Sequence, residues 1–138
     1  MRTIKFRGKT CKDGKWVYGS YLESTRSWGM EKRKPTKCWI VEDSMTRGGF
    51  IALLQRYPVQ EETVGQFTGL VDKNGVEIYE GDLVRGYCDT TFLVVYDRIS
   101  TSFRANVDNG VFLDIDYYGL DKLEVIGNIH DIVEKPMT

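Results

Sequence analysis

The sequence predicts a mainly β fold, between all-β and α+β, that is rich in hairpins and closes with a short C-terminal helix. Three observations predict it: short apolar runs, turn residues between them, and alternation of apolar and polar residues over 103–107 and 111–115. With 138 residues, the chain is long enough for one compact domain. We expect a single domain over residues 1–138, organised as two lobes: a basic lobe over 1–62 and an acidic lobe over 63–138.

The first lobe begins with a predicted hairpin. Residues 4–7 alternate charged and apolar side chains, residues 12–15 supply a turn, and residues 16–22 are rich in aromatic and β-branched side chains. Residues 38–41 and 59–67 predict two further strands. Residues 50–57 suit either a strand or a short helix. We favour the strand because a helix there would have only two turns before Pro58.

The second lobe is predicted to hold five or six short strands between residues 63 and 127 and to resemble a small SH3-like barrel. Strands are expected over 83–88, 92–96 and 123–127, and Asn128 is expected to cap a helix over 129–134. The clearest hairpin joins 103–107 to 111–115. A three-residue loop of Asp108, Asn109 and Gly110 would set Val107 opposite Val111 and Ala105 opposite Leu113, which keeps the apolar side chains on one face.

Residues 64–84 link the two lobes and read VGQFTGLVDKNGVEIYEGDLV. We expect Gly69 and the pair Asn74–Gly75 to reverse the chain, and Gly81–Asp82 to turn it into the acidic half. Residues 73–84, KNGVEIYEGDLV, also resemble residues 12–22, KDGKWVYGSYL, with one extra residue before the second glycine. A small duplicated β unit and coincidence both explain this likeness.

The chain resembles the YopX family, small proteins of phages and prophages of Gram-positive bacteria and their relatives. The resemblance rests on the opening IKFR (4–7), on GQFTGLVDKNGVEIYEGDLV (65–84) and on LEVIGNIHD (123–131). It extends over both ends and the centre of the chain but not over 23–57. It implies a phage or prophage origin and a compact β-rich fold, and it implies no activity.

The net charge of −1 hides a division along the chain. Residues 1–71 carry a net charge of +6, and residues 72–138 carry −7. Three explanations remain open: two solvated surfaces, attraction between lobes or copies, and an anionic partner for the basic half. The candidate contacts to an anion or nucleic acid are Lys5, Arg7, Lys32, Arg33, Lys34 and Lys37. An exposed loop also explains the run at 32–37, because no aromatic stacking residue interleaves with its charges, apart from Trp28 just before it.

Aromatic residues are more numerous than a small core needs, with 3 Trp, 8 Tyr and 6 Phe. Tyr and Trp are favoured at protein interfaces, so part of this set is expected to be exposed there. The candidate interface aromatics are Trp16, Tyr18, Trp28 and Trp39.

Catalytic and metal chemistry find little support. The three cysteines, Cys11, Cys38 and Cys88, are widely spaced, and His130 is the only histidine. Metal sites and Cys–His or Ser–His catalysis need closer groupings than these. The pair Asp114 and Asp116 shares one face of a predicted strand, which is typical of a solvated face. We expect no catalytic residues, no metal and no cofactor.

The sequence therefore predicts a non-enzymatic binding or assembly protein that self-associates through aromatic and charge-complementary surfaces. The alternative is a nucleic-acid-binding accessory factor that uses the basic half. No apolar run approaches the length of a membrane span, and residues 1–7 lack the apolar region of a signal peptide. We expect the cytoplasm of the bacterial host cell, a homo-oligomer, and a host or phage protein as a further partner.

Overall fold

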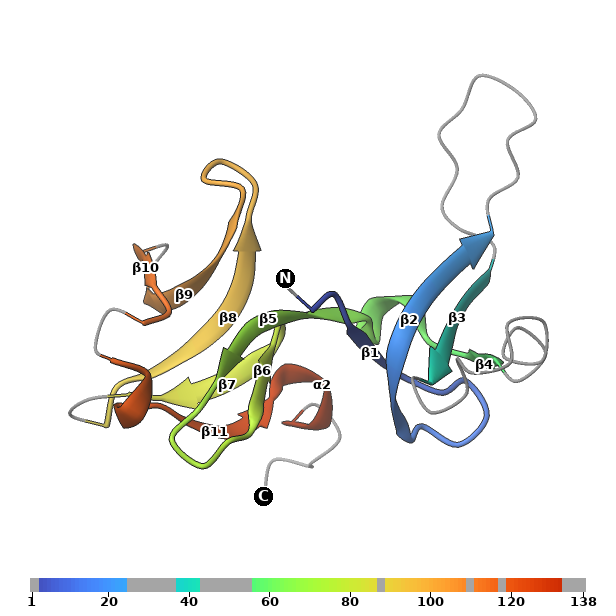
Figure 1. The fold of residues 1–138 in the computed structure, drawn as a ribbon, viewed down its shortest axis with the longest axis horizontal. Coiled ribbons are helices and arrows are strands. Elements are labelled where there is room, and N and C mark those ends of the chain that lie inside the picture. Colours follow the sequence, from blue (N-terminus) through green and yellow to red (C-terminus); the bar gives the residue numbers. More distant parts are fainter. Residues whose placement is uncertain are drawn as a thin grey trace. The chain divides into compact units, whose positions relative to one another are not determined.

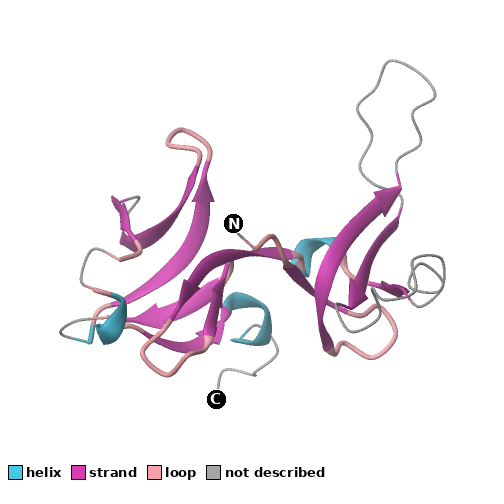
Figure 2. Cartoon of the chain, in the orientation of Figure 1, coloured by secondary structure: helices cyan, strands magenta, loops and turns pink. Residues whose placement is uncertain are grey.

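The computed structural model describes residues 3–24, 37–42, 56–86, 89–108, 111–116 and 119–132. The fold is mainly β, as predicted, with strands far outnumbering helical turns (Figure 2). The chain divides into two compact units, which are described separately: unit 1 over Thr3–Gln66 and unit 2 over Phe67–Thr138. The boundary lies four residues beyond the 62/63 position that the sequence suggested. None of the helices in the described ranges is long and apolar enough to cross a membrane.

Unit 1 is an antiparallel sheet in the order β4-β3-β2-β1-β5 (Figure 1). Its elements are β1 (Phe6–Lys9), β2 (Trp16–Ser24), β3 (Lys37–Glu42), β4 (Arg56–Pro58), the 3-10 helix η2 (Glu61–Thr63) and the first residues of β5 (Gly65–Val71). The predicted hairpin of β1 and β2 is confirmed, with Gly8 opposite Val17. Of the predicted strand over 50–57, residues 50–55 lie outside the described residues, and Arg56 and Tyr57 belong to β4.

One face of this sheet carries the apolar core of unit 1. Val17, Cys38, Ile40 and Val59 are buried there, and Phe6 contacts Tyr21 with ring centroids 5.5 Å apart. Cross-strand partners share a face of a sheet, so the side chains that alternate with these point to the opposite side.

The predicted strand over 59–67 is interrupted. Val59 forms a single bridge to Thr10, η2 follows, and β5 begins only at Gly65. The Thr63 hydroxyl donates to the Gln60 carbonyl at 2.7 Å and accepts from the Lys9 amide at 2.9 Å. This side-chain bonding to the backbone competes with strand pairing, which explains why the predicted strand gives way to a tight turn.

Unit 2 contains a five-stranded antiparallel sheet in the order β10-β9-β8-β7-β11. The remaining elements are β6 (Glu77–Tyr79), β7 (Asp82–Arg85), β8 (Thr91–Asp97), β9 (Ser102–Asp108), β10 (Val111–Asp114), the 3-10 helix η4 (Leu120–Lys122), β11 (Glu124–Asn128) and α2 (Ile129–Ile132). β10 and β11 are the two edges. Among the described strands no pairing joins them, so these strands form no closed barrel, and the predicted SH3-like barrel is not confirmed.

The core of unit 2 lies between this sheet and the hairpin of β5 and β6. Its buried side chains are Ile78, Val84, Phe92, Val94, Ala105, Ile115 and Leu123. Asp72, in the turn between β5 and β6, connects the hairpin to the sheet edge. Its carboxylate accepts hydrogen bonds from the amides of Asn74 (2.8 Å), Val76 (2.9 Å) and Val125 (2.9 Å).

The predicted turn residues of this hairpin divide into two groups. Asn74 and Gly75 lie in the reversal, and Gly75 has a positive φ of 80°. Gly69 does not reverse the chain, contrary to the prediction. It lies inside β5 with φ 89°, where the pairing with β6 shifts register. A glycine at a bulge provides the positive φ without ending the strand.

The hairpin of β9 and β10 corrects one prediction and confirms another. Val111 pairs with Asp108, so the three-residue loop is wrong, and Asn109 and Gly110 lie outside the described residues. The register then shifts between Val111 and Phe112, so Leu113 pairs with Ala105 as predicted. A bulge therefore keeps the apolar side chains on one face after a shorter loop.

Asn128 caps α2 as predicted. Its side-chain oxygen accepts from the amides of His130 (3.0 Å) and Asp131 (2.9 Å), and its amide nitrogen donates to Asp131 at 2.8 Å. These bonds satisfy amides that a helix start otherwise leaves without acceptors.

Candidate binding face

The face of the unit 1 sheet opposite the core gathers aromatic and basic side chains from four strands. Lys9 lies opposite Trp16, and Arg7 lies opposite Tyr18. Ser24 lies opposite Lys37, Leu22 opposite Trp39, and Val41 opposite Arg56. We call this surface the aromatic–basic face and define it by Arg7, Lys9, Trp16, Tyr18, Lys37, Trp39 and Arg56.

Cations lie over indole rings on this face. The Arg56 guanidinium is 4.7 Å from the Trp39 ring centroid. Arg7 is 4.7 Å and the Lys9 ammonium is 5.5 Å from the Trp16 ring centroid. Cation–π contacts of this kind are favourable by about 0.5–1 kcal/mol at exposed sites and more where water is excluded. They hold the rings and the cations in fixed positions.

The face has a buried end and an exposed end. Arg7 and Lys9 are 6% and 4% exposed. Tyr18 is 43% and Leu22 is 37% exposed, and the side chains of Lys37 and Arg56 are also exposed. A ligand can therefore reach the surface of β2, β3 and β4, whereas Arg7 and Lys9 hold Trp16 in place.

Acidic side chains are excluded from this face. On β2 and β3, the alternation places Glu23 and Glu42 on the core face, opposite Cys38 and Gly19. Within the described parts of β1 to β4, no Asp or Glu occupies the aromatic–basic face. Its local potential is therefore positive, although the whole chain has a net charge of −1.

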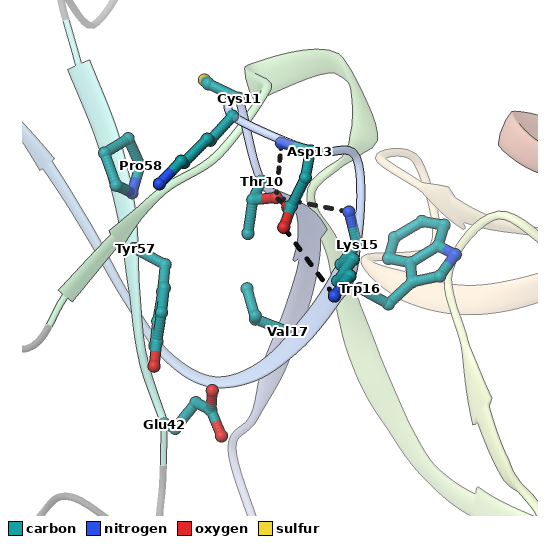
Figure 3. A pocket seen from close by; sticks show the side chains of 10 residues that line it. Thr10, Cys11, Asp13, Lys15, Trp16, Val17, Glu42, Tyr57 and Pro58 are labelled. Carbon is teal, nitrogen blue, oxygen red and sulfur yellow. Dashed lines mark hydrogen bonds and ion pairs between the residues drawn. The ribbon is translucent and has the colours of Figure 1, made fainter.

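Two hollows border the sheet of unit 1. The larger, about 610 Å³, lies at the turn between β1 and β2 and is lined by Thr10, Cys11, Lys12, Asp13, Lys15, Trp16, Val17, Glu42, Tyr57 and Pro58 (Figure 3). The smaller, about 480 Å³, is lined by Lys37, Trp39 and Pro58 together with Cys11, Cys38, Val59, Gln60, Glu61 and Glu62. The two glutamates bring negative charge to that border.

Polar groups of the larger hollow bond to one another inside the turn (Figure 3). The Thr10 hydroxyl donates to Asp13 and accepts from the Lys15 amide at 3.2 Å. The hydrogen bond from Thr10 lowers the pKa of Asp13, and Lys15 adds to this effect from 4.0 Å. These contacts stabilise the turn. Cys11, which also lines this hollow, cannot form a Cys–His pair within unit 1, because the chain's one histidine, His130, belongs to unit 2.

Some of the predicted site residues lie together on this face. Arg7 and Lys37 share it with Trp16, Tyr18 and Trp39, and Lys5 lies partly exposed just before β1. Arg7 was predicted to contact an anion, and its burial makes it a support for Trp16 instead. Trp28, Lys32, Arg33, Lys34 and Cys88 lie outside the described residues.

The carboxylates form no clustered site in the part of the chain that is described, where no three His, Cys, Asp or Glu side chains are placed to share a metal. Asp114 lies on a solvated face as predicted, and it accepts from Arg104 at 2.9 Å. Asp82 is 1% exposed and accepts from the Tyr79 amide at 2.7 Å. These are structural roles.

Sequence reasoning missed Arg56 and Lys9. Arg56 is 17 residues from Trp39 along the chain, and only the pairing of β3 with β4 brings them together. Lys9 lies opposite Trp16, and this contact depends on the register of β1 and β2. A cation that lies directly opposite an aromatic residue on a predicted partner strand, as Lys9 does, or two positions from that point, as Arg56 does, is the signal that could have identified both.

Comparison with known proteins places the chain in a fold and a family. A solved structure, the crystal structure of protein EF1440 from Enterococcus faecalis, matches with a TM-score of 0.53 and 22% sequence identity. The match covers 97% of this chain and 98% of that one, and it shows that the two share a fold. No curated protein matches. The model of the YopX protein family matches residues 5–134, so the chain belongs to the YopX family.

Proposed function

We propose that the chain is a non-catalytic binding protein of a phage or prophage, and that it contacts a negatively charged partner in the cytoplasm of the bacterial host. The observation that carries this proposal is the aromatic–basic face. It combines two exposed cations, Lys37 and Arg56, with the rings of Tyr18 and Trp39 on a rigid sheet. Aromatic residues and arginine are the side chains most enriched at the energetic centres of interfaces.

The chemistry of the described hollows supports a role without catalysis. An enzyme needs a nucleophile or a base whose side chain points into a pocket with polar groups around it. In the larger hollow, Asp13 and Thr10 are engaged with each other. Tyr57, Pro58 and Val17 also line this hollow and offer contact surface, and Glu42 lies beside them (Figure 3).

The proposal is tested with heparin, a general polyanion, and with tryptophan fluorescence as the readout. Trp16, Trp28 and Trp39 all belong to unit 1, so the signal reports on that unit. The double variant Lys37→Ala/Arg56→Ala should weaken heparin binding about tenfold or more, since it removes the two exposed cations of the face. Lys73→Ala/Arg98→Ala is the matched control, because both side chains are exposed in unit 2. Equal weakening by the two pairs would show that the chain binds polyanions without using this face.

Self-association is a second candidate, supported by a different observation. Several large apolar side chains are exposed, including Ile4 (62%) in unit 1 and Ile99 (96%) in unit 2. Together with the charges of +6 and −7 on the two parts of the sequence, they would favour contacts between copies. Light scattering at micromolar concentration tests this, and a monomer under all conditions would contradict it.

A further inference from the structure

We propose that the negatively charged partner of the aromatic–basic face is single-stranded nucleic acid, with bases stacking on Tyr18 and Trp39 and phosphates contacting Lys37 and Arg56. This inference rests on the proposed function and names its ligand. Three observations carry it: the side-chain pattern of β2, the pairing of β3 with β4, and the size of the face.

The exposed side of β2 alternates large and small side chains. Tyr18, Ser20, Leu22 and Ser24 follow one another on this side. Tyr18 and Leu22 are therefore about 13 Å apart at 3.3 Å per residue. Ser20, which is exposed between them, leaves room above the sheet for a planar group that lies against Tyr18. Unstacked bases are recognised in this way, by stacking on aromatic rings that project from a sheet.

The pair of Arg56 and Trp39 places a cation and a ring at one point of the face. The guanidinium lies over the indole at 4.7 Å, and this contact restricts its rotation before any ligand arrives. Arginine positioned in this way loses less conformational entropy when it binds phosphate. Lys37, two residues from Trp39 on the same side of β3, adds a second positive charge next to the ring.

The size of the face favours a nucleic-acid strand over a protein. The three strands β2 to β4 are about 14 Å wide, and the six residues of β3 are about 20 Å long, so the flat area is roughly 300 Å². A standard protein–protein interface buries about 800 Å² of accessible surface on each partner, so a protein would also have to contact surface beyond these three strands. A few nucleotides need far less surface, since one aromatic ring accommodates each base. A duplex fits poorly, because its stacked bases are closed to side-chain rings.

The test measures binding of a fluorescein-labelled oligothymidine of about 12 nucleotides, within the range that single-strand-binding domains cover. Two phosphate contacts give a salt slope of about −1.4, so affinity should fall about sevenfold between about 50 and 200 mM salt. Tyr18→Leu should weaken binding about tenfold by removing the ring. Tyr18→Phe keeps the ring and should bind within about twofold of the wild type, which separates stacking from apolar contact.

Tyr96→Leu is the matched control in unit 2. Tyr96 is 44% exposed, against 43% for Tyr18, and it also lies on a strand. It should leave the affinity unchanged. Glu61→Gln/Glu62→Gln should strengthen binding, because these carboxylates border Lys37 and Trp39. The melting temperature of each variant shows that a loss of binding is not a loss of folding.

Each outcome decides between the alternatives. Equal affinity for a duplex of the same sequence, or no effect of Tyr18→Leu, would overturn the stacking of bases on this face. Binding of heparin or polyglutamate that depends on Lys37 and Arg56, without binding of the oligonucleotide, would overturn nucleic acid as the partner and leave the proposed function intact. If none of these polyanions bound, both proposals would fail.

Discussion

Units 1 and 2 use the same short sequence pattern to build different structures. In unit 1, KDGKWVYGSYL passes through Gly19 as one continuous strand, β2. In unit 2, KNGVEIYEGDLV turns at Glu80 and Gly81 between β6 and β7. The extra residue and the buried carboxylate of Asp82, which accepts from the Tyr79 amide, separate the two outcomes. A Tyr–Gly pattern between strands therefore does not by itself specify a turn.

The two glycines are consequently required for different physical reasons. A Cβ on Gly19 would lie 1.9 Å from the Val41 carbonyl oxygen of the neighbouring strand. Gly81 instead has a φ of 94°, and both its backbone groups are bonded, its amide to Val94 and its carbonyl to Ile129. Close approach of two strands explains the first glycine, and a left-handed turn explains the second.

Gly19→Ala is expected to have the largest effect on stability. The new methyl group must displace the backbone of β3, so unit 1 should lose about 3 kcal/mol, the upper part of the range for overpacking. Urea unfolding followed by tryptophan fluorescence measures it, because the three tryptophans belong to unit 1.

Gly14→Ala is the control for this variant. Gly14 has a φ of 68°, and a Cβ there would meet nothing within 4 Å. Its loss should be about 1 kcal/mol, which is the cost of the left-handed conformation alone. Equal losses at Gly14 and Gly19 would contradict the close approach of β2 and β3.

Gly81→Val comes next, with an expected loss of about 2 kcal/mol in unit 2, because a β-branched residue is disfavoured at positive φ. Far-UV circular dichroism follows the unfolding, since the described part of unit 2 lies beyond the last tryptophan. Gly127→Ala serves as the comparison: a Cβ there meets nothing within 4 Å, and stability should change little. An unchanged melting temperature for Gly81→Val would show that this turn tolerates other conformations.

Asp72 gives unit 2 a dependence on pH. Burial would raise the pKa of Asp72, but hydrogen bonds from the amides of Val125, Val76 and Asn74 outweigh it and lower the pKa below its usual value. A carboxyl with a lowered pKa stabilises the fold above its unfolded pKa, near 3.9, and this contribution is lost as the pH falls through the folded pKa.

Asp72→Asn should therefore cost about 1–2 kcal/mol at neutral pH, because one acceptor oxygen is lost. The difference from the wild type should shrink as the pH falls from about 5 toward the folded pKa. Chemical unfolding at a series of pH values measures it. A difference that stayed constant across this range would mean that the charge of Asp72 contributes nothing.

The sequence predicted the element types well and the contacts between elements poorly. Alternation and turn residues identified β1, β2, β3 and the cap of α2, since these are local features. The boundary of β5 was missed because the Thr63 hydroxyl competes for backbone groups. The aromatic–basic face as a whole was not predicted. Its residues come from different strands and lie together only because of the strand register, which short sequence patterns do not determine.

The same limit explains the treatment of the basic residues. Charge patterning pointed to the run at 32–37, which has few aromatic neighbours along the chain. Aromatic neighbours of Arg56 and Lys9 come instead from the next strand, as Trp39 and Trp16. A charged residue on a strand has neighbours along the chain and neighbours on the adjacent strands, and a sequence pattern shows only the first group.

The smallest expected effects concern two arginines that make different contacts in the two units. Arg56 lies over the Trp39 ring in unit 1, and Arg104 pairs with the largely exposed Asp114 in unit 2. Arg56→Ala and Arg104→Ala should each cost about 0.5–1 kcal/mol at low salt. At about 1 M KCl the Debye length falls to about 3 Å, so the part of the Arg104→Ala cost that comes from the ion pair with Asp114 should be lost, while the part that comes from its hydrogen bond to the Phe112 carbonyl (3.3 Å) should remain. Arg56→Ala should keep more than half of its cost, because its hydrocarbon stem packs on the ring without charge. Equal screening of the two would mean that Arg56 acts as a surface charge and that its position over Trp39 contributes little.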